Sequence, residues 1–92
     1  MIKSFADKHT QMLFERKRVL KWKHIEQIAR RKLKDLDKAI SLEELREIPS
    51  NRLHKLTKDR KGQWSLTIKD QYRICFWWKN GNAYEVEIVD YH

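Results

Sequence analysis

The sequence predicts an α+β domain in which helices cover one face of an antiparallel β-sheet. Residues 1–48 contain no glycine or proline, a composition that favours helices. After Pro49, apolar residues alternate with polar ones in three successive runs, which is the period of a half-buried β-strand. The runs are separated by short turns, which favour antiparallel pairing. Because the helices precede the strands, they are expected to pack together on one side of the sheet.

Two helices are predicted in the N-terminal half of the chain. The stronger pattern runs from His24 to Ile40, where apolar residues recur at intervals of three and four and form one stripe. This stripe consists of Ile25, Ile28, Ala29, Leu33, Leu36, Ala39 and Ile40. A weaker pattern covers Asp7 to Lys17, with Met12, Leu13 and Phe14 as the expected buried residues. A short edge strand is expected from Ile2 to Phe5, before this helix.

A capping motif follows the longer helix. Ser41 begins the sequence Ser-Leu-Glu-Glu, a capping box in which the Glu44 carboxylate reaches back to the amide of the cap residue. The motif predicts a single helical turn that continues through Leu45.

Three strands are predicted after the helices. They cover Trp64 to Ile68, Tyr72 to Trp78 and Tyr84 to Val89. The connecting turns are Lys69-Asp70-Gln71 and Asn80-Gly81-Asn82, so the strands should form an antiparallel meander.

The register of the last hairpin is predicted from burial. A two-residue Asn-Gly loop would place apolar residues of one strand opposite Glu85 and Glu87 of the other. A loop of three residues, Asn80 to Asn82, keeps one face apolar throughout, so this is the register we expect. It pairs Trp78 with Tyr84, Phe76 with Val86, and Ile74 with Ile88.

The predicted register places several polar residues at one end of the sheet. Arg73 then lies opposite Val89 on the polar face, one step from Tyr91. Asp90 falls on the helix-facing side, and His92 continues from the same end. Arg73, Tyr91 and His92 are therefore expected to converge at one margin of the face that the helices leave open.

Length and composition narrow the class of protein. Ninety-two residues fit one domain, residues 1–92, and 21 Lys and Arg against 13 Asp and Glu give a formal charge of +8. This charge favours nucleic acid as the partner, ahead of a membrane surface or an acidic protein. The single cysteine, Cys75, fits a reducing cytoplasm. No apolar run suits a signal peptide or a membrane span.

The segment between Pro49 and Trp64 is strongly basic. We expect a short extended piece around His54, followed by a basic loop that ends at Gly62. Such a loop beside a sheet suits contacts with a phosphate backbone, and the alternative is an ordinary solvated loop. The candidate RNA-binding residues are Arg52, Lys55, Lys58, Arg60 and Lys61.

Two histidines and an arginine suggest a reaction. Cleavage of RNA by its own 2′-hydroxyl group needs a base, an acid and a cation that stabilises the phosphorane, and His54, His92 and Arg73 can supply these roles. The sequence has no metal-ligand spacing, P-loop or dinucleotide-binding motif, so no metal and no cofactor is expected. The residues alone leave two alternatives, a metal-free ribonuclease and a nucleic-acid-binding protein without activity.

The motifs also resemble a known family. The segments NRLHKL, DRKGQWSLTIKDQYRICFWW and YEVEIVDYH, with the opening IKSFADKHT and the helix ARRKLKDLDKA, resemble the HigB toxins of bacterial type II toxin–antitoxin systems, in the RelE/ParE superfamily. The resemblance covers essentially the whole chain. It implies two N-terminal helices packed on one face of a twisted antiparallel sheet.

The resemblance implies a function as well. HigB toxins are ribosome-dependent endoribonucleases that cut translated mRNA in the A site of the 70S ribosome, and a helix-turn-helix antitoxin of the HigA type neutralises them. By this resemblance the catalytic residues are His54, Arg73, Asp90, Tyr91 and His92. Other members of the superfamily poison DNA gyrase without cutting RNA, so a non-cleaving poison of gyrase or translation is the alternative. Which histidine is the base is left open.

Overall fold

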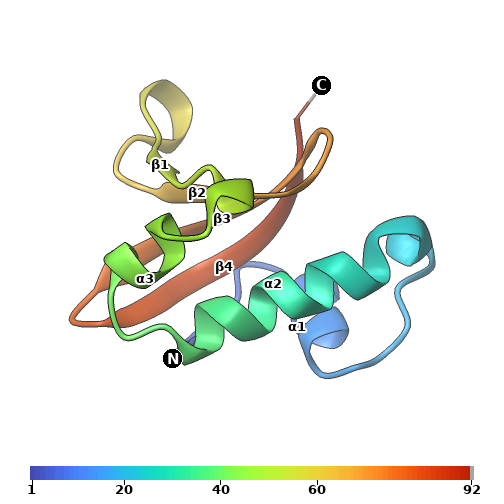
Figure 1. Ribbon diagram of the computed structural model, residues 1–92. Helices are drawn as coiled ribbons and strands as arrows, with labels where there is room; N and C mark the ends of the chain where they lie inside the picture. Colours follow the sequence, from blue (N-terminus) through green and yellow to red (C-terminus); the bar gives the residue numbers. More distant parts are fainter. Residues whose placement is uncertain (92) are drawn as a thin grey trace.

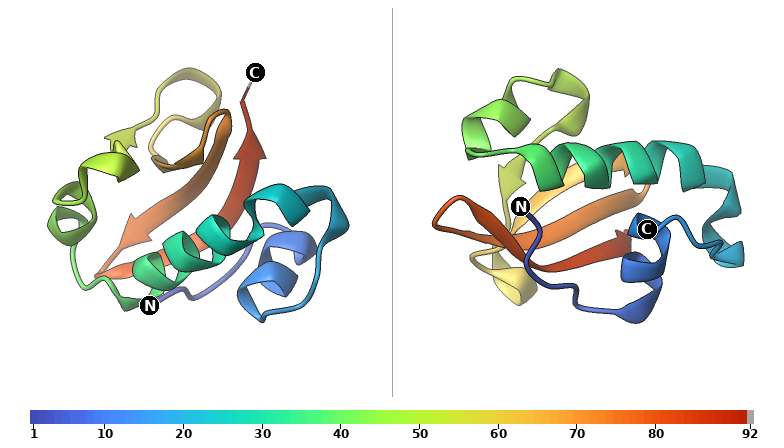
Figure 2. Two further views of the ribbon diagram at one scale, coloured as in Figure 1. Left: turned by 45° about the vertical axis from the view of Figure 1, so that its right-hand side comes forward. Right: turned by 90° about the horizontal axis from the view of Figure 1, so that it is seen from below.

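The computed structural model describes residues 1–91 and has two layers (Figure 1). One layer is an antiparallel sheet of order β1-β2-β3-β4, and helices α1 and α2 cover one of its faces, as predicted (Figure 2). The strands are β1 (His54–Lys55), β2 (Trp64–Lys69), β3 (Tyr72–Lys79) and β4 (Asn82–Asp90). The helices are α1 (Lys8–Phe14), α2 (Glu26–Lys38) and α3 (Leu42–Arg46), with shorter 3₁₀ turns η1 (Leu20–Ile25), η2 (Pro49–Asn51) and η3 (Lys58–Arg60). Within residues 1–91, no helix is long and apolar enough to cross a membrane.

Helix α2 provides most of the helical side of the core. The residues of its apolar stripe face the sheet, and Ala29, Leu33 and Leu36 are fully buried there. The prediction for Ile40 is wrong, because this side chain is 77% exposed. The helix ends at Lys38 and Ala39 is extended, so the helical period no longer carries residue 40 toward the core.

Helix α1 begins at a side-chain cap and also closes the edge of the sheet. The Asp7 carboxylate accepts hydrogen bonds from the Thr10 amide at 3.1 Å and the Thr10 hydroxyl at 2.6 Å. The Thr10 hydroxyl oxygen in turn accepts a hydrogen bond from the Ile88 amide of β4 at 3.0 Å. The expected edge strand occurs as two isolated parallel bridges, Ile2 with Ala83 and Phe5 with Val86. Residues of the N-terminus therefore satisfy backbone groups of β4 that would otherwise form an open edge.

The turn before β1 is anchored by a buried lysine. Lys32 of α2 donates through Nζ to the side chains of Ser50 and Asn51, and Asn51 donates to the Leu45 carbonyl. Burial lowers the pKa of Lys32. This network ties η2, and thus the start of β1, to the helical layer.

The predicted register of the last hairpin is correct at one end and wrong at the other. Ile74 pairs with Ile88 and Arg73 with Val89, as expected, but Trp78 pairs with Ala83 rather than Tyr84. Asn80 and Gly81 both have positive φ and form a two-residue loop, the preferred conformation of Asn-Gly. A bulge then restores the apolar register, because Glu85 and Val86 together face Phe76.

Candidate active site

The face of the sheet that the helices leave open carries a row of polar side chains. Cross-strand pairing aligns His54, Ser65, Cys75 and Glu87 in one row across all four strands. The neighbouring row contains Thr67, Arg73 and Val89, and Tyr91 follows at the end of β4. Because directly opposed residues share a face, His54, Arg73 and Tyr91 all belong to the open face.

Arg73 is held in place from two sides. Its Nη1 donates a hydrogen bond of 2.7 Å to the Thr67 hydroxyl on the adjacent strand. Its guanidinium carbon lies 5.8 Å from the centroid of the Tyr91 ring, which is a cation–π geometry. These contacts use only part of the guanidinium, which has five N–H donors in a fixed fork. The predicted convergence of Arg73 and Tyr91 is therefore present.

Tyr91 is fixed at the end of the sheet although it lies next to the last residue. Its amide donates to the Gln71 carbonyl at 2.8 Å, which extends the pairing beyond β4. Its hydroxyl lies 3.8 Å from the Cys75 sulfur, and the residue is 38% exposed. Burial raises the pKa of both the Tyr91 phenol and the Cys75 thiol. Both groups are thus protonated at neutral pH, and the phenol can donate a hydrogen bond.

His54 is the exposed group of the polar row. Its Nδ1 lies 3.2 Å from the Arg52 carbonyl oxygen, so the tautomer with a proton on Nδ1 donates there and leaves Nε2 as an acceptor. By strand spacing, the His54 backbone is about 10 Å from that of Cys75. His54 therefore shares the face with Arg73 and Tyr91 but lies two strands from Arg73 and three from Tyr91, a separation that leaves room for a bound nucleotide.

Asp90 and His92 complete the predicted catalytic set. Asp90 lies opposite Tyr72, whose side chain packs against the helix-side core, so it is on the other face from Arg73. His92 lies outside the residues that the structure describes.

The predicted RNA-binding residues fall into two groups. Four of them are exposed around β1 and η3: Arg52, Lys55, Lys58 and Lys61. Arg60 is instead half-buried and forms an ion pair with Glu87 of β4 at 3.0 Å, and this hydrogen bond raises the pKa of Arg60. The pair ties the basic loop to the open face.

An aromatic ring packs on the basic loop at Gly62. Gly62 has φ +97°, and a Cβ there would lie 2.8 Å from Cζ3 of Trp77. The Trp77 ring thus packs directly on the loop backbone while the residue stays 44% exposed. Sequence reasoning did not identify Thr67, Cys75, Glu87 or Trp77 as site residues, although strand alternation already places all four on the open face.

The fold and this face together define a class of protein. N-terminal helices on one face of a four-stranded antiparallel sheet, with a basic open face, form the architecture of the RelE-like toxins. The family model described as the RelE-like toxin of type II toxin–antitoxin system HigB matches residues 3–92. The chain belongs to this family of HigB-like toxins, and a type II toxin has a cognate antitoxin as its partner.

Two relatives agree with this assignment and confirm the resemblance predicted from the sequence. The chain is 40% identical over 95 residues to a protein of Proteus vulgaris named endoribonuclease HigB, and the match covers both chains completely. It is 36% identical over 86 residues to toxin HigB-1 of Vibrio cholerae, and this match covers 90% of each chain.

Proposed function

We propose that this protein is an endoribonuclease that cleaves translated mRNA in the A site of the ribosome by attack of the RNA's own 2′-hydroxyl group. The observation that carries the proposal is the Arg73–Tyr91 pair, held by Thr67 and Cys75 on the open face that also bears His54. The full-length relative named endoribonuclease HigB supports the same activity.

Each residue has a role in this reaction. Arg73 stabilises the negative charge that develops on the scissile phosphate. The protonated Tyr91 donates a hydrogen bond to the phosphate or stacks on a base. His54 and His92 supply the base and the acid, in an order that is left open, and Asp90 orients an imidazole or the backbone beside it. The proposed reaction uses no metal ion or cofactor.

The partners follow from the charge around β1 and η3, beside the open face. The exposed cations Arg52, Lys55, Lys58 and Lys61 contact phosphates of the mRNA or of ribosomal RNA, and Arg60 positions their loop through Glu87. The ribosome, and thus the toxin, is in the cytoplasm, and an antitoxin of the HigA type, with a helix-turn-helix fold, neutralises it there.

Mapping of mRNA 5′ ends on translating ribosomes tests the proposal. The protein is expected to produce cuts within the A-site codon, and Arg73→Ala is expected to remove them. His54→Ala should reduce the rate by about 10²–10⁴-fold while leaving the fold intact, because this exposed side chain contributes proton transfer rather than packing. His9→Ala, which removes an exposed histidine on α1, is the matched control. Stalled but intact mRNA, or inhibited gyrase, would show a non-cleaving poison instead.

A further inference from the structure

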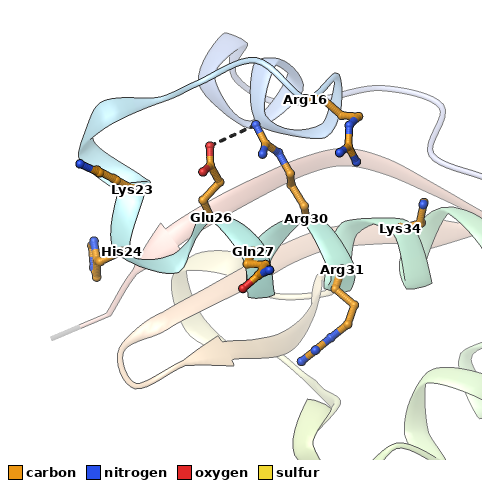
Figure 3. A pocket seen from close by; sticks show the side chains of 8 residues that line it. All are labelled: Arg16, Lys23, His24, Glu26, Gln27, Arg30, Arg31 and Lys34. Carbon is orange, nitrogen blue, oxygen red and sulfur yellow. Dashed lines mark ion pairs between the residues drawn. The ribbon is translucent and has the colours of Figure 1, made fainter.

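A second basic feature lies on the helical side of the molecule. A hollow of about 610 Å³ runs along the solvent side of α2, between this helix and the segment that follows α1 (Figure 3). Five cations and one carboxylate line it, together with His24 and Gln27. We call this hollow the α2 groove.

The carboxylate of the α2 groove is already neutralised. Glu26 pairs with Arg30 at 3.2 Å and with Arg18 at 3.8 Å. Arg30 also donates to the Leu13 carbonyl at 3.0 Å and the Lys17 carbonyl at 2.9 Å, so it forms part of the groove's wall. The other four lining cations form no ion pair within residues 1–91: Arg16, Lys23, Arg31 and Lys34. Their charge is therefore available to an anionic ligand.

Arg16 adds an independent observation. It has φ +68°, and the amides of Arg16 and Lys17 close the end of α1 by donating to the carbonyls of Leu13 and Met12. Glycine is the usual residue at this position of a helix end, because the left-handed conformation strains a residue with a Cβ atom. Arg16 is one of six non-glycine residues with positive φ within residues 1–91, and at the rim of the groove it adds a cation where glycine would relieve the backbone strain.

The lining also indicates the kind of ligand. Within residues 1–91, the side chains that line the α2 groove are all polar or charged, although Phe14 lines a smaller hollow that shares Arg16, Arg30 and Lys34 with it. Protein interfaces bind mainly through apolar and aromatic anchors. In the described part of the chain, the lining of the α2 groove also contains no Trp, Tyr or Phe, on which the bases of single-stranded RNA would stack. Double-helical RNA is instead recognised through its phosphates and 2′-hydroxyl groups, with little contact to the bases.

We propose that the α2 groove binds the phosphate backbone of double-helical RNA. This site lies on the helical layer and is separate from the open face, whose exposed Trp77 and Tyr91 suit an unpaired strand. The proposal does not depend on cleavage, because a non-cleaving protein with this groove would bind the same ligand. It adds to the protein a second RNA contact that holds structured RNA while the open face acts on a single strand.

The test compares two triple variants with the same change in charge. The groove variant combines Lys23→Gln, Arg31→Gln and Lys34→Gln, and the control variant combines Lys3→Gln, Lys8→Gln and Lys79→Gln at exposed positions elsewhere. Fluorescence anisotropy measures binding of a blunt RNA duplex of mixed sequence and of one of its single strands at several salt concentrations. The groove variant should bind the duplex at least about tenfold more weakly, with a salt slope reduced by roughly 2 to 3. Equal losses in both triple variants would overturn the proposal.

Arg16→Gly separates RNA binding from folding. This change relieves backbone strain, so the midpoint of thermal unfolding should stay the same or rise while the affinity for the duplex falls. Arg16→Lys retains the charge and should bind nearly as the parent protein does. Unchanged duplex binding by Arg16→Gly would contradict the proposal. A groove variant that loses affinity for the cognate antitoxin but keeps its affinity for the duplex would also contradict the proposal, because the groove would then be a protein interface.

Discussion

At the scale of single residues, the hydroxyl of Thr67 determines where Arg73 points. The 2.7 Å hydrogen bond leaves the guanidinium in one orientation on the open face. Small misplacements of a catalytic group have large effects on rate, because the reacting geometry is lost. In the proposed reaction, Thr67 is therefore a positioning residue that acts through Arg73.

We expect Thr67→Val to lower single-turnover mRNA cleavage on ribosomes by about 10- to 100-fold, with little change in ribosome affinity. Thr67→Ser keeps the hydroxyl and should retain most of the rate. Thr57→Val is the matched control, because it is the same change at an exposed threonine whose side chain makes no cap hydrogen bond. Equal rates for Thr67→Val and the parent protein would show that Arg73 does not depend on this contact.

The buried thiol of Cys75 links stability to pH. Burial raises its pKa in the folded state above the ordinary value of 9.0, so the folded protein holds the proton more tightly than the unfolded chain. This contribution to stability is complete below the ordinary pKa and is lost as the pH rises toward the raised pKa of the folded state.

The free energy of unfolding should therefore fall as the pH rises above 9.0, and that of the Cys75→Ala variant should fall less steeply over the same range. Urea denaturation at several pH values from neutral upward measures both slopes. The Tyr91→Phe variant should be measured in the same way, because burial also raises the pKa of the Tyr91 phenol, whose ionisation would contribute to the slope. Parallel curves for the parent protein and Cys75→Ala would exclude the thiol as the source.

At the scale of elements, the basic loop after β1 depends on one close contact. Gly62 and Gly81 both have positive φ, so alanine is strained at either position. They differ in their surroundings: a Cβ at Gly62 would meet the Trp77 ring at 2.8 Å, whereas a Cβ at Gly81 would meet the Ile40 carbonyl oxygen at an ordinary 3.5 Å.

Gly81→Ala should lower the free energy of unfolding by about 1–2 kcal/mol through backbone strain alone. Gly62→Ala should lower the free energy of unfolding by more than this, because the Trp77 ring must also move. The same variant should weaken ribosome association, because the loop is displaced. Urea denaturation and ribosome co-sedimentation of both variants measure the difference. Equal destabilisation, with ribosome binding retained, would mean that the ring moves freely and does not fix the loop.

At the scale of the whole molecule, the candidate site is a sheet surface rather than an enclosed pocket. Tyr91 and His54 are exposed on the same face, but they lie at opposite edges of the four-stranded sheet. A chain of 92 residues has little additional surface with which to align a flexible RNA for attack by its 2′-hydroxyl group. The ribosome holds mRNA in a defined path, and such orientation is worth about 7–11 kcal/mol of a reaction barrier.

Free mRNA should consequently be cut orders of magnitude more slowly than the same mRNA on a translating ribosome. Cleavage of one labelled transcript, measured with and without ribosomes at equal protein concentration, tests this expectation. Arg73→Ala controls for contaminating nucleases in both reactions. Comparable rates for free and ribosome-bound mRNA would show that the protein orients its substrate without help.

Much of the fold could be predicted from local patterns. The spacing of the apolar residues correctly predicted α2 and the three long strands, and the alternation within β3 correctly predicted that Arg73 lies on the polar face. Two errors have local causes: Ile40 lies beyond the end of α2, and the hairpin near Trp78 follows the preference of Asn-Gly for a two-residue loop.

The sequence by itself determined the class of fold, the face of the sheet on which Arg73 and Tyr91 lie, and the family, because periodicity and short motifs are local properties of the chain. Only the tertiary structure showed which groups touch across long separations. Ser4 supports the bulge by accepting a hydrogen bond from the Glu85 amide, 81 residues away, and Arg60 pairs with Glu87, 27 residues away. The α2 groove likewise depends on how the segment after α1 returns to α2. Such contacts are decided by packing and charge in three dimensions, which no period along the chain encodes.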